Sequence, residues 1–190
     1  MNERSENDVK NNSLWRRFTE GDTLAFDALI KQHYTDLFGY GLKFSKDKNL
    51  LKDTVHDAFV ALWQNRLLLN PKKNPKYYLF TIFRNQLLKS LKTPYLLDET
   101  HFETLSEEAI DLQLIQAAAA AAAEAKVHLL IRKLPIRHQE ALHLRFSEEL
   151  DNDQIADLMN VNKQSVANLI HSGLKMLREL WVLLLHVLFV

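Results

Sequence analysis

Polar side chains recur at helical spacing between positions 162 and 175 and could hydrogen-bond the edges of DNA bases. Glutamine and asparagine can pair with adenine, and lysine can reach guanine acceptors or phosphates. These residues follow a short helix and a tight turn in the segment NDQIADLMNVNKQSVANLIHSGLKMLR, residues 152–178. The pattern is typical of a helix-turn-helix, whose second helix enters the major groove. The residues expected to face DNA are Lys163, Gln164, Ser165, Asn168, His171, Ser172 and Lys175. A plain helical hairpin with a polar face is the alternative.

A second group of residues could neutralise phosphates. The segment PKKNPKYYLFTIFRNQLLKSLK, residues 71–92, contains six Lys/Arg, no acid and four aromatic residues. Cations in such a segment favour nucleic-acid binding, and aromatic rings among them can stack on unpaired bases. The alternative is that Tyr78, Leu79, Ile82 and Phe83 form a core while the lysines are solvated. For the lysines of the loop we favour contact with nucleic acid.

Catalytic patterns are missing from the sequence. The eight histidines are scattered without HExxH spacing, and no glycine-rich phosphate loop or nucleophile motif occurs. The chain has no cysteine, which excludes disulfides and thiolate metal ligands. We therefore expect neither an enzyme nor a metal or cofactor site. The polar start MNERSENDVKNNS lacks the apolar centre of a signal peptide, so a cytoplasmic location is expected.

Charge is distributed unevenly although the formal net charge is zero. Residues 14–93 hold 14 Lys/Arg against 7 Asp/Glu, residues 94–126 hold 1 against 7, and residues 127–190 hold 7 of each. A basic first half is a candidate for binding a polyanion, and an acidic connector limits unspecific binding.

The elements that position these residues are all expected to be helices. Only four glycines and four prolines occur, and apolar residues recur at spacings of three and four. We predict helices at about 23–44, 50–65 and 76–91, two short helices broken by Pro135, then helices at 152–159 and from 163 onwards. The fold class is therefore all-α, with two small helical domains at 14–93 and 127–180. An acidic and alanine-rich linker spans 94–126, and an apolar tail spans 181–190.

Local signals define the second domain in more detail. Asp151 and Gln154 form a capping-box pattern, and Asn162 can cap the final helix. Along that helix we expect an inward face made of Val166, Leu169, Ile170, Leu174 and Leu177. The alanine run 117–123 is either a helical spacer or a stretch of unassigned residues, and no function is attached to it. The tail is too short to span a bilayer and is expected to fold back on the domain or to be covered by a partner.

Four segments together resemble a known family. The segments are DTVHDAFVALW (53–63), YYLFTIFRNQLL (77–88), LPIRHQEALHLRF (134–146) and the helix-turn-helix segment at 151–178. In this order they are similar to bacterial RNA polymerase sigma factors of the extracytoplasmic-function group in the sigma-70 family. The resemblance covers roughly residues 14–92 and 127–180.

The resemblance implies a division of labour between the two domains. The first would bind the clamp of core RNA polymerase, at β′, through Asp53, His56, Asp57, Phe59 and Trp63, although Trp63 could instead be core. The first domain would also bind the promoter −10 element through Lys72, Lys73, Asn74, Lys76, Tyr77, Arg84, Asn85 and Lys89. The second domain would bind the β flap and read the −35 element as duplex through Lys163, Gln164, Ser165, Asn168, His171 and Lys175.

Regulation and affinity are implied as well. An anti-sigma factor is the expected inhibitory partner. This sequence departs from the family pattern at Ala167, Ser172 and Gly173, where basic residues or alanine are common, and at Lys89, where an acid is common. We therefore expect weak duplex binding by the second domain alone, with polymerase supplying the effective concentration. The rival reading is a helix-turn-helix regulator that works without polymerase, and a third is a helical interaction protein.

Overall fold

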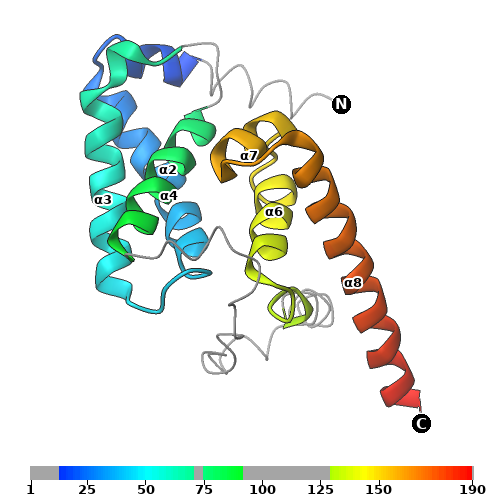
Figure 1. Cartoon of the computed structure of the whole chain (residues 1–190). Coiled ribbons are helices and arrows are strands. Elements are labelled where there is room, and N and C mark those ends of the chain that lie inside the picture. Colours follow the sequence, from blue (N-terminus) through cyan, green and yellow to red (C-terminus); the bar gives the residue numbers. More distant parts are fainter. Residues whose placement is uncertain (1–12, 71–74, 92–128, 190) are drawn as a thin grey trace. The chain divides into compact units, whose positions relative to one another are not determined.

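A computed structural model describes residues 13–70, 75–91 and 129–189, with side chains described as far as Val182. Within these ranges every regular element is a helix, which confirms the predicted all-α class. The chain divides into two compact units, Met1–Pro94 and Tyr95–Val190 (Figure 1). Lys72, Lys73 and Asn74, the linker and the alanine run lie outside the described residues.

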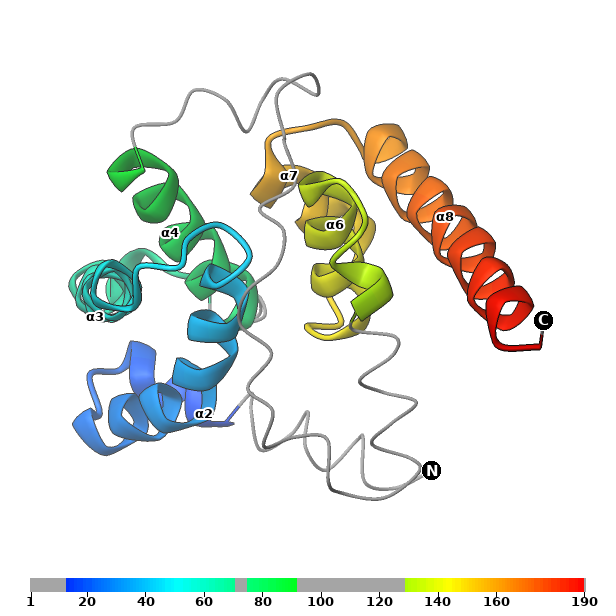
Figure 2. The same ribbon diagram turned by 90° about the horizontal axis from the view of Figure 1, so that it is seen from below.

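Unit 1 is built from α2 (Thr23–Gly41), α3 (Lys48–Gln64), the 3-10 turn η1 (Arg66–Leu68) and α4 (Pro75–Ser90), preceded by a helical turn at 13–19. Helix α3 packs along α4, and α2 contacts both; α3 is seen almost along its axis in Figure 2. The predicted helices are confirmed with shifted ends. Helix α3 begins two residues before the predicted start because Asp47 caps it, accepting hydrogen bonds from the backbone N–H groups of Asn49 and Leu50.

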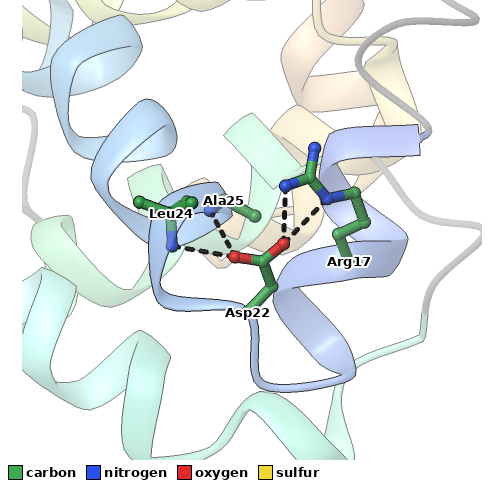
Figure 3. A network of polar contacts seen from close by, with 4 residues as sticks. All are labelled: Arg17, Asp22, Leu24 and Ala25. Atoms are coloured by element: carbon green, nitrogen blue, oxygen red, sulfur yellow. Dashed lines mark hydrogen bonds and ion pairs between the residues drawn. The ribbon is translucent and has the colours of Figure 1, made fainter.

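Asp22 connects the first helical turn to α2. Its Oδ1 accepts hydrogen bonds from the backbone N–H groups of Leu24 at 2.8 Å and Ala25 at 3.1 Å, and its Oδ2 accepts one from Arg17 Nε at 2.8 Å (Figure 3). The hydrogen bond from Arg17 and those from the backbone hold the pKa of Asp22 below its ordinary value. A single carboxylate therefore caps α2 and anchors the preceding turn.

Aromatic rings fill the core of unit 1. Trp15 stacks on Phe18 with ring centroids 5.1 Å apart, and Phe26 of α2 lies 4.9 Å from Trp63 of α3. At the other end of α2, Tyr40 lies 5.2 Å from Phe80 of α4. Residues spaced by three and four along α2 form one apolar stripe, and all its members are buried or half-buried: Phe26, Leu29, Ile30, His33, Leu37, Tyr40 and Gly41.

Gly41 lies where α2 comes close to side chains of α3 and α4. A Cβ atom at this position would lie 2.7 Å from Leu51 Cδ2 and 2.9 Å from Phe83 Cζ. Real Cβ atoms do not come so near to carbon, so only glycine fits without movement of the core. Gly39, on the same helix, has nothing within 4 Å of the equivalent atom.

Unit 2 contains α6 (Ile136–Phe146), α7 (Asn152–Met159) and α8 (Lys163–Phe189), preceded by a helical turn at 129–131. Pro135 separates that turn from α6, as predicted. Helix α8 packs against both α6 and α7. The buried side chains at their centre are Leu134, Ala141, Leu142, Leu144, Leu150, Ile155, Leu158, Met159 and Val166.

Helix α8 extends well beyond α6 (Figures 1 and 2). It runs without a break for 27 residues to Phe189, so the tail does not fold back on the domain, and its covering by a partner stays a prediction. The physical reason is that no glycine or proline follows Gly173, and leucine-rich sequence continues a helix readily. At its last described side chains, Trp181 is 36% and Val182 59% exposed. Within the described residues, none of the helices combines the length and the apolar character that a membrane crossing requires.

Two alanine substitutions on α2 should have opposite effects on stability. Gly41→Ala should lower the free energy of unfolding by about 1–3 kcal/mol because the added methyl overpacks the core. Gly39→Ala should raise it by up to about 1 kcal/mol through helix propensity alone. Urea unfolding of the full chain, followed by circular dichroism, measures both. Equal shifts of the two midpoints would show that the contact at Gly41 is relieved by movement of Leu51 and Phe83.

Candidate nucleic-acid interface

The entry to α7 is held by the capping box predicted from the sequence. Asp151 Oδ1 accepts a hydrogen bond from the backbone N–H of Gln154 at 2.8 Å, and Gln154 Oε1 accepts one from the backbone N–H of Asp151 at 3.0 Å. Each residue's side chain thus accepts a hydrogen bond from the other's backbone N–H, which would otherwise lack an acceptor within the helix. This prediction is confirmed atom by atom.

The turn between α7 and α8 depends on asparagine at both ends. Asn160 adopts the left-handed conformation, with φ 54° and ψ 52°, which asparagine tolerates better than most residues. The Val161 N–H then donates to the Ala156 carbonyl at 2.9 Å. Asn162 Oδ1 accepts from the backbone N–H of Ser165 at 2.7 Å, which confirms the predicted cap of α8. The direction of α8 is therefore set within three residues.

A polar ridge runs along the first three turns of α8. Its members are exposed and spaced by four, three and four residues: Gln164, Asn168, His171 and Lys175. Such spacing places all four on one face of a helix. At the start of the ridge, Gln164 Nε2 donates a hydrogen bond to Asn168 Oδ1 at 3.0 Å. The arrangement offers donors and acceptors at the end of the helix that a helix-turn-helix inserts into a major groove.

Lys163 of α8 forms an ion pair with Asp153 of α7. Its Nζ lies 2.8 Å from Asp153 Oδ2, and both side chains are exposed. The hydrogen bond from Lys163 to Asp153 is the main reason why the pKa of Lys163 is raised above its ordinary value. The ion pair reduces the positive charge that α8 presents on its own.

The departures noted at Ser172 and Gly173 have a structural cause. A Cβ atom at Gly173 would lie 3.1 Å from Leu142 Cδ1, so glycine lets α8 pass close to α6. Ser172 Oγ donates to the Asn168 carbonyl at 2.7 Å, and it is hydrogen-bonded to His138 Nε2 of α6, 2.9 Å away. Ser172 is therefore turned towards α6, and its predicted outward orientation is wrong.

The predicted inward face of α8 also needs one correction. Val166 and Leu169 are buried, while Ile170 and Leu177 are half-buried. Leu174 is 42% exposed, so its predicted inward orientation is wrong. The close approach at Gly173 explains this difference, because it turns position 173 towards α6, and Leu174, about 100° further round the helix, lies at the edge of the buried face.

Helix α4 carries the described part of the cationic segment. Asn85 and Lys89 are exposed and one turn apart, whereas Lys76 is half-buried. Tyr77 is 7% and Arg84 3% exposed, so both side chains lie almost entirely inside unit 1. The core alternative holds for Leu79 and Phe83, which are fully buried; Tyr78 and Ile82 are half-buried.

The chain leading into the loop at 71–74 is anchored by two rings. Trp15 Nε1 donates to the Asn70 carbonyl at 3.3 Å, and the Asn70 N–H donates to the Tyr78 hydroxyl at 3.2 Å. The rings of Trp15 and Tyr78 are stacked with centroids 5.9 Å apart. This clamp fixes Asn70, the residue directly before the loop. Sequence reasoning missed Trp15, because no local pattern connects residues 55 positions apart.

On α3, the residues expected to contact a protein partner separate into two faces. Asp53, His56 and Asp57 are exposed, and Val60, which sequence reasoning missed, is 39% exposed beside them. Phe59 is 4% exposed and belongs to the core. Trp63 is half-buried, with the Arg66 guanidinium 4.4 Å from its ring centroid. Asp53, His56, Asp57 and Val60 thus form an acidic face with one apolar member, and the exposed Lys52 borders it.

Comparisons with known proteins find the same two regions in the same order. Residues 29–93 match the Sigma-70 region 2 family and residues 124–177 match Sigma-70, region 4. The chain is 20% identical over 162 residues to the ECF RNA polymerase sigma factor SigM of Bacillus subtilis (strain 168), covering 83% of this chain and 96% of that protein.

Solved structures share the fold. CnrH, solved in complex with the cytosolic domain of CnrY, matches with a TM-score of 0.60 at 19% identity, covering 90% of this chain and 96% of that one. The sigma factor RpoE from Bartonella quintana, solved in complex with the anti-sigma factor NepR, matches with a TM-score of 0.57 at 16% identity, covering 82% and 96%.

Removal of the capping box should destabilise unit 2 selectively. Asp151→Ala should lower the free energy of unfolding by about 0.5–2 kcal/mol, because the first turn of α7 loses its side-chain acceptor. Asp153→Ala, the matched control, removes an exposed acid from the same turn and should cost less than about 1 kcal/mol. Asp151→Ser should retain most of the stability. Urea unfolding of the three variants tests this, and similar losses for Asp151→Ala and Asp153→Ala would contradict it.

Proposed function

The chain belongs to the sigma-70 family of RNA polymerase sigma factors, in the extracytoplasmic-function group, and we propose that its two units divide promoter recognition between them. As a sigma factor it directs core RNA polymerase to promoters for the initiation of transcription and is not itself an enzyme. The observation that carries the proposal is the succession of a region 2 match and a region 4 match on two separate helical units.

Unit 2 reads the −35 element as duplex DNA. The exposed ridge of Gln164, Asn168, His171 and Lys175 enters the major groove, with Lys163 and Ser165 at its start. What supports this role is the fixed entry angle of α8, since the caps at Asp151 and Asn162 define where the helix begins. A reading helix must be held rigidly if its side chains are to distinguish bases.

Unit 1 captures the −10 element as it opens. Lys72, Lys73, Asn74, Lys76, Asn85 and Lys89 contact the DNA, the lysines by neutralising phosphates. Tyr77 and Arg84 act from inside unit 1, where they shape the α4 surface, because their side chains are almost fully buried. The clamp of Trp15 and Tyr78 on Asn70 positions the start of the loop.

The acidic face of α3 binds the clamp of core polymerase at β′. Asp53, His56 and Asp57 make the contact, together with Val60, because these side chains are exposed on one face. Phe59 and Trp63 hold that face in place from the core side. Unit 2 binds the β flap, which holds the −35 reader on the enzyme.

An anti-sigma factor keeps the protein inactive until a signal arrives. Two proteins of similar fold were solved in complexes, RpoE with the anti-sigma factor NepR and CnrH with the cytosolic domain of CnrY. The acidic face of α3 is one surface that such a partner would have to cover to prevent binding of polymerase.

The alternative is a regulator that binds DNA without polymerase. The charge balance of the duplex-binding residues disfavours it. Unit 2 must supply the duplex contacts, yet residues 127–190 carry seven positive and seven negative side chains, and Lys163 is paired with Asp153. Few phosphates can be neutralised by such a surface. Polymerase therefore has to supply the effective concentration that unit 2 lacks.

The purified chain should form a stable complex with core polymerase and start transcripts from specific double-stranded promoters. By itself it should bind duplex promoter DNA negligibly at physiological salt, because its duplex-binding unit has no net positive charge. In vitro transcription and gel-shift assays, each with and without core enzyme, measure both properties. Tight, sequence-specific duplex binding without polymerase would favour the autonomous regulator instead.

Charge reversal on α3 should uncouple the protein from polymerase. Asp53→Lys combined with Asp57→Lys should weaken association with core enzyme by at least about tenfold, because acidic side chains at the interface are replaced by repelling ones. Asp27→Lys together with Glu20→Lys makes the same charge change at two exposed acids of unit 1 outside α3 and should leave affinity unchanged. Fluorescence anisotropy with labelled protein gives the affinities. A comparable loss in both double variants would mean that net charge, rather than the α3 face, governs the association.

A further inference from the structure

The first exposed turn of α8 carries two amides that are already hydrogen-bonded to each other. We propose that Gln164 and Asn168 form one reading unit that selects an adenine, on either strand, at a single position of the −35 duplex. This inference rests on the proposed function of unit 2 and names the base that its helix recognises.

The geometry holds Gln164 before any DNA is bound. Gln164 Nε2 donates to Asn168 Oδ1 at 3.0 Å, one helical turn further along. Beneath the pair, Val166 is fully buried and Leu169 nearly so, while Asn162 caps the helix immediately before it. The amide of Gln164 is thus attached to a rigid part of α8, and less rotamer freedom is lost on binding.

Hydrogen-bonding capacity then selects the base. The amide nitrogen of glutamine has two hydrogens, and the bond to Asn168 uses one of them. Gln164 keeps one N–H and the acceptor Oε1. In the major groove adenine offers an acceptor, N7, beside a donor, N6–H, which satisfies both groups. Guanine offers two acceptors, cytosine only a donor, and thymine only an acceptor and a methyl group.

Asn168 acts as the positioning residue of the pair. Its contribution is the Oδ1 acceptor, which orients the Gln164 amide. An aspartate at this position would keep an acceptor in the same place, whereas alanine would remove it. The two substitutions therefore separate orientation of Gln164 from any general effect of altering position 168.

The other polar residues of α8 are not placed to form a similar base-reading pair. Lys163 is bonded to Asp153 of α7, and His171 and Lys175 lie two and three turns along the helix. In a docked helix-turn-helix the N-terminal residues of the second helix meet base edges, while residues further along approach the phosphates. Substitution of Gln164 should therefore change the base preference at one position of the −35 element. Substitution of Lys175 should change it at no position.

The test uses full-length protein with core polymerase and a promoter library randomised across the −35 element, read by sequencing the transcripts. The unaltered chain should prefer adenine at one position by about 5- to 150-fold, the discrimination expected of a bidentate pair. Gln164→Ala should reduce that preference to within about twofold of equality and leave the other positions unchanged. Gln164→Glu should exchange adenine for cytosine there, because a carboxylate accepts from the cytosine amino group.

Substitutions at Asn168 and at Lys175, which is expected to contact a phosphate, serve as controls. Asn168→Ala should reduce the adenine preference by at least about threefold, whereas Asn168→Asp should preserve it while lowering transcription from all sequences, because a negative charge approaches phosphates. Lys175→Ala should lower transcription uniformly without changing any preference. All the altered side chains are exposed, so the folded state should be retained, as circular dichroism can verify.

The possible results separate this inference from the proposed function. Specific initiation without an adenine preference, or a preference that survives Gln164→Ala, overturns the reading unit and leaves the sigma-factor role intact. Equal loss in Asn168→Ala and Asn168→Asp overturns the positioning role of the Oδ1 acceptor. Absence of initiation from every library member with the unaltered chain, despite active core enzyme, contradicts the proposed function itself.

Discussion

The reading surface depends on one constraint, the abrupt change of direction between α7 and α8. Asn160 makes that change in the left-handed conformation, and Asn162 then accepts the first backbone hydrogen bond of the new helix. Because α8 starts at a defined residue, its exposed ridge has a defined register relative to α7. The contact of α6 with Gly173 fixes the same helix at a second point, two turns beyond the ridge's first pair. Base recognition requires both restraints, since a helix that rotated by one residue would present a different face.

Electrostatics explain why the two units have to work together. Unit 1 concentrates positive charge, while residues 127–190 of unit 2 are balanced and use their first recognition-helix lysine in an ion pair with Asp153. The acidic segment 94–126 that precedes those residues adds negative charge to the chain. A protein so arranged gains specificity from hydrogen bonds and affinity from its attachment to a larger enzyme. The buried positions of Tyr77 and Arg84 fit this picture, because they stabilise the surface of α4 without adding to its exposed charge.

Predictions from the sequence succeeded where the interaction is local. The capping box of Asp151 with Gln154 spans three residues, and the cap of Asn162 on Ser165 spans three as well. The stripe of α2 follows from helical periodicity alone. Helix ends were less accurate, as at Asp47, because a polar run offers several possible caps. The order of the four motifs was also sufficient for the family, which the matches to regions 2 and 4 confirmed.

By itself, the sequence determined the all-helical class, the capped corner, the polar ridge of α8 and the family. Only the tertiary structure decided which side chains within a candidate set remain exposed. Ser172 turns to His138, Leu174 faces outward, and Arg84 is buried, because each outcome depends on a neighbouring helix distant in sequence. The clamp of Trp15 on Asn70 has the same origin. Periodicity identifies the apolar face of a helix, but which neighbouring helix buries that face depends on how the helices pack.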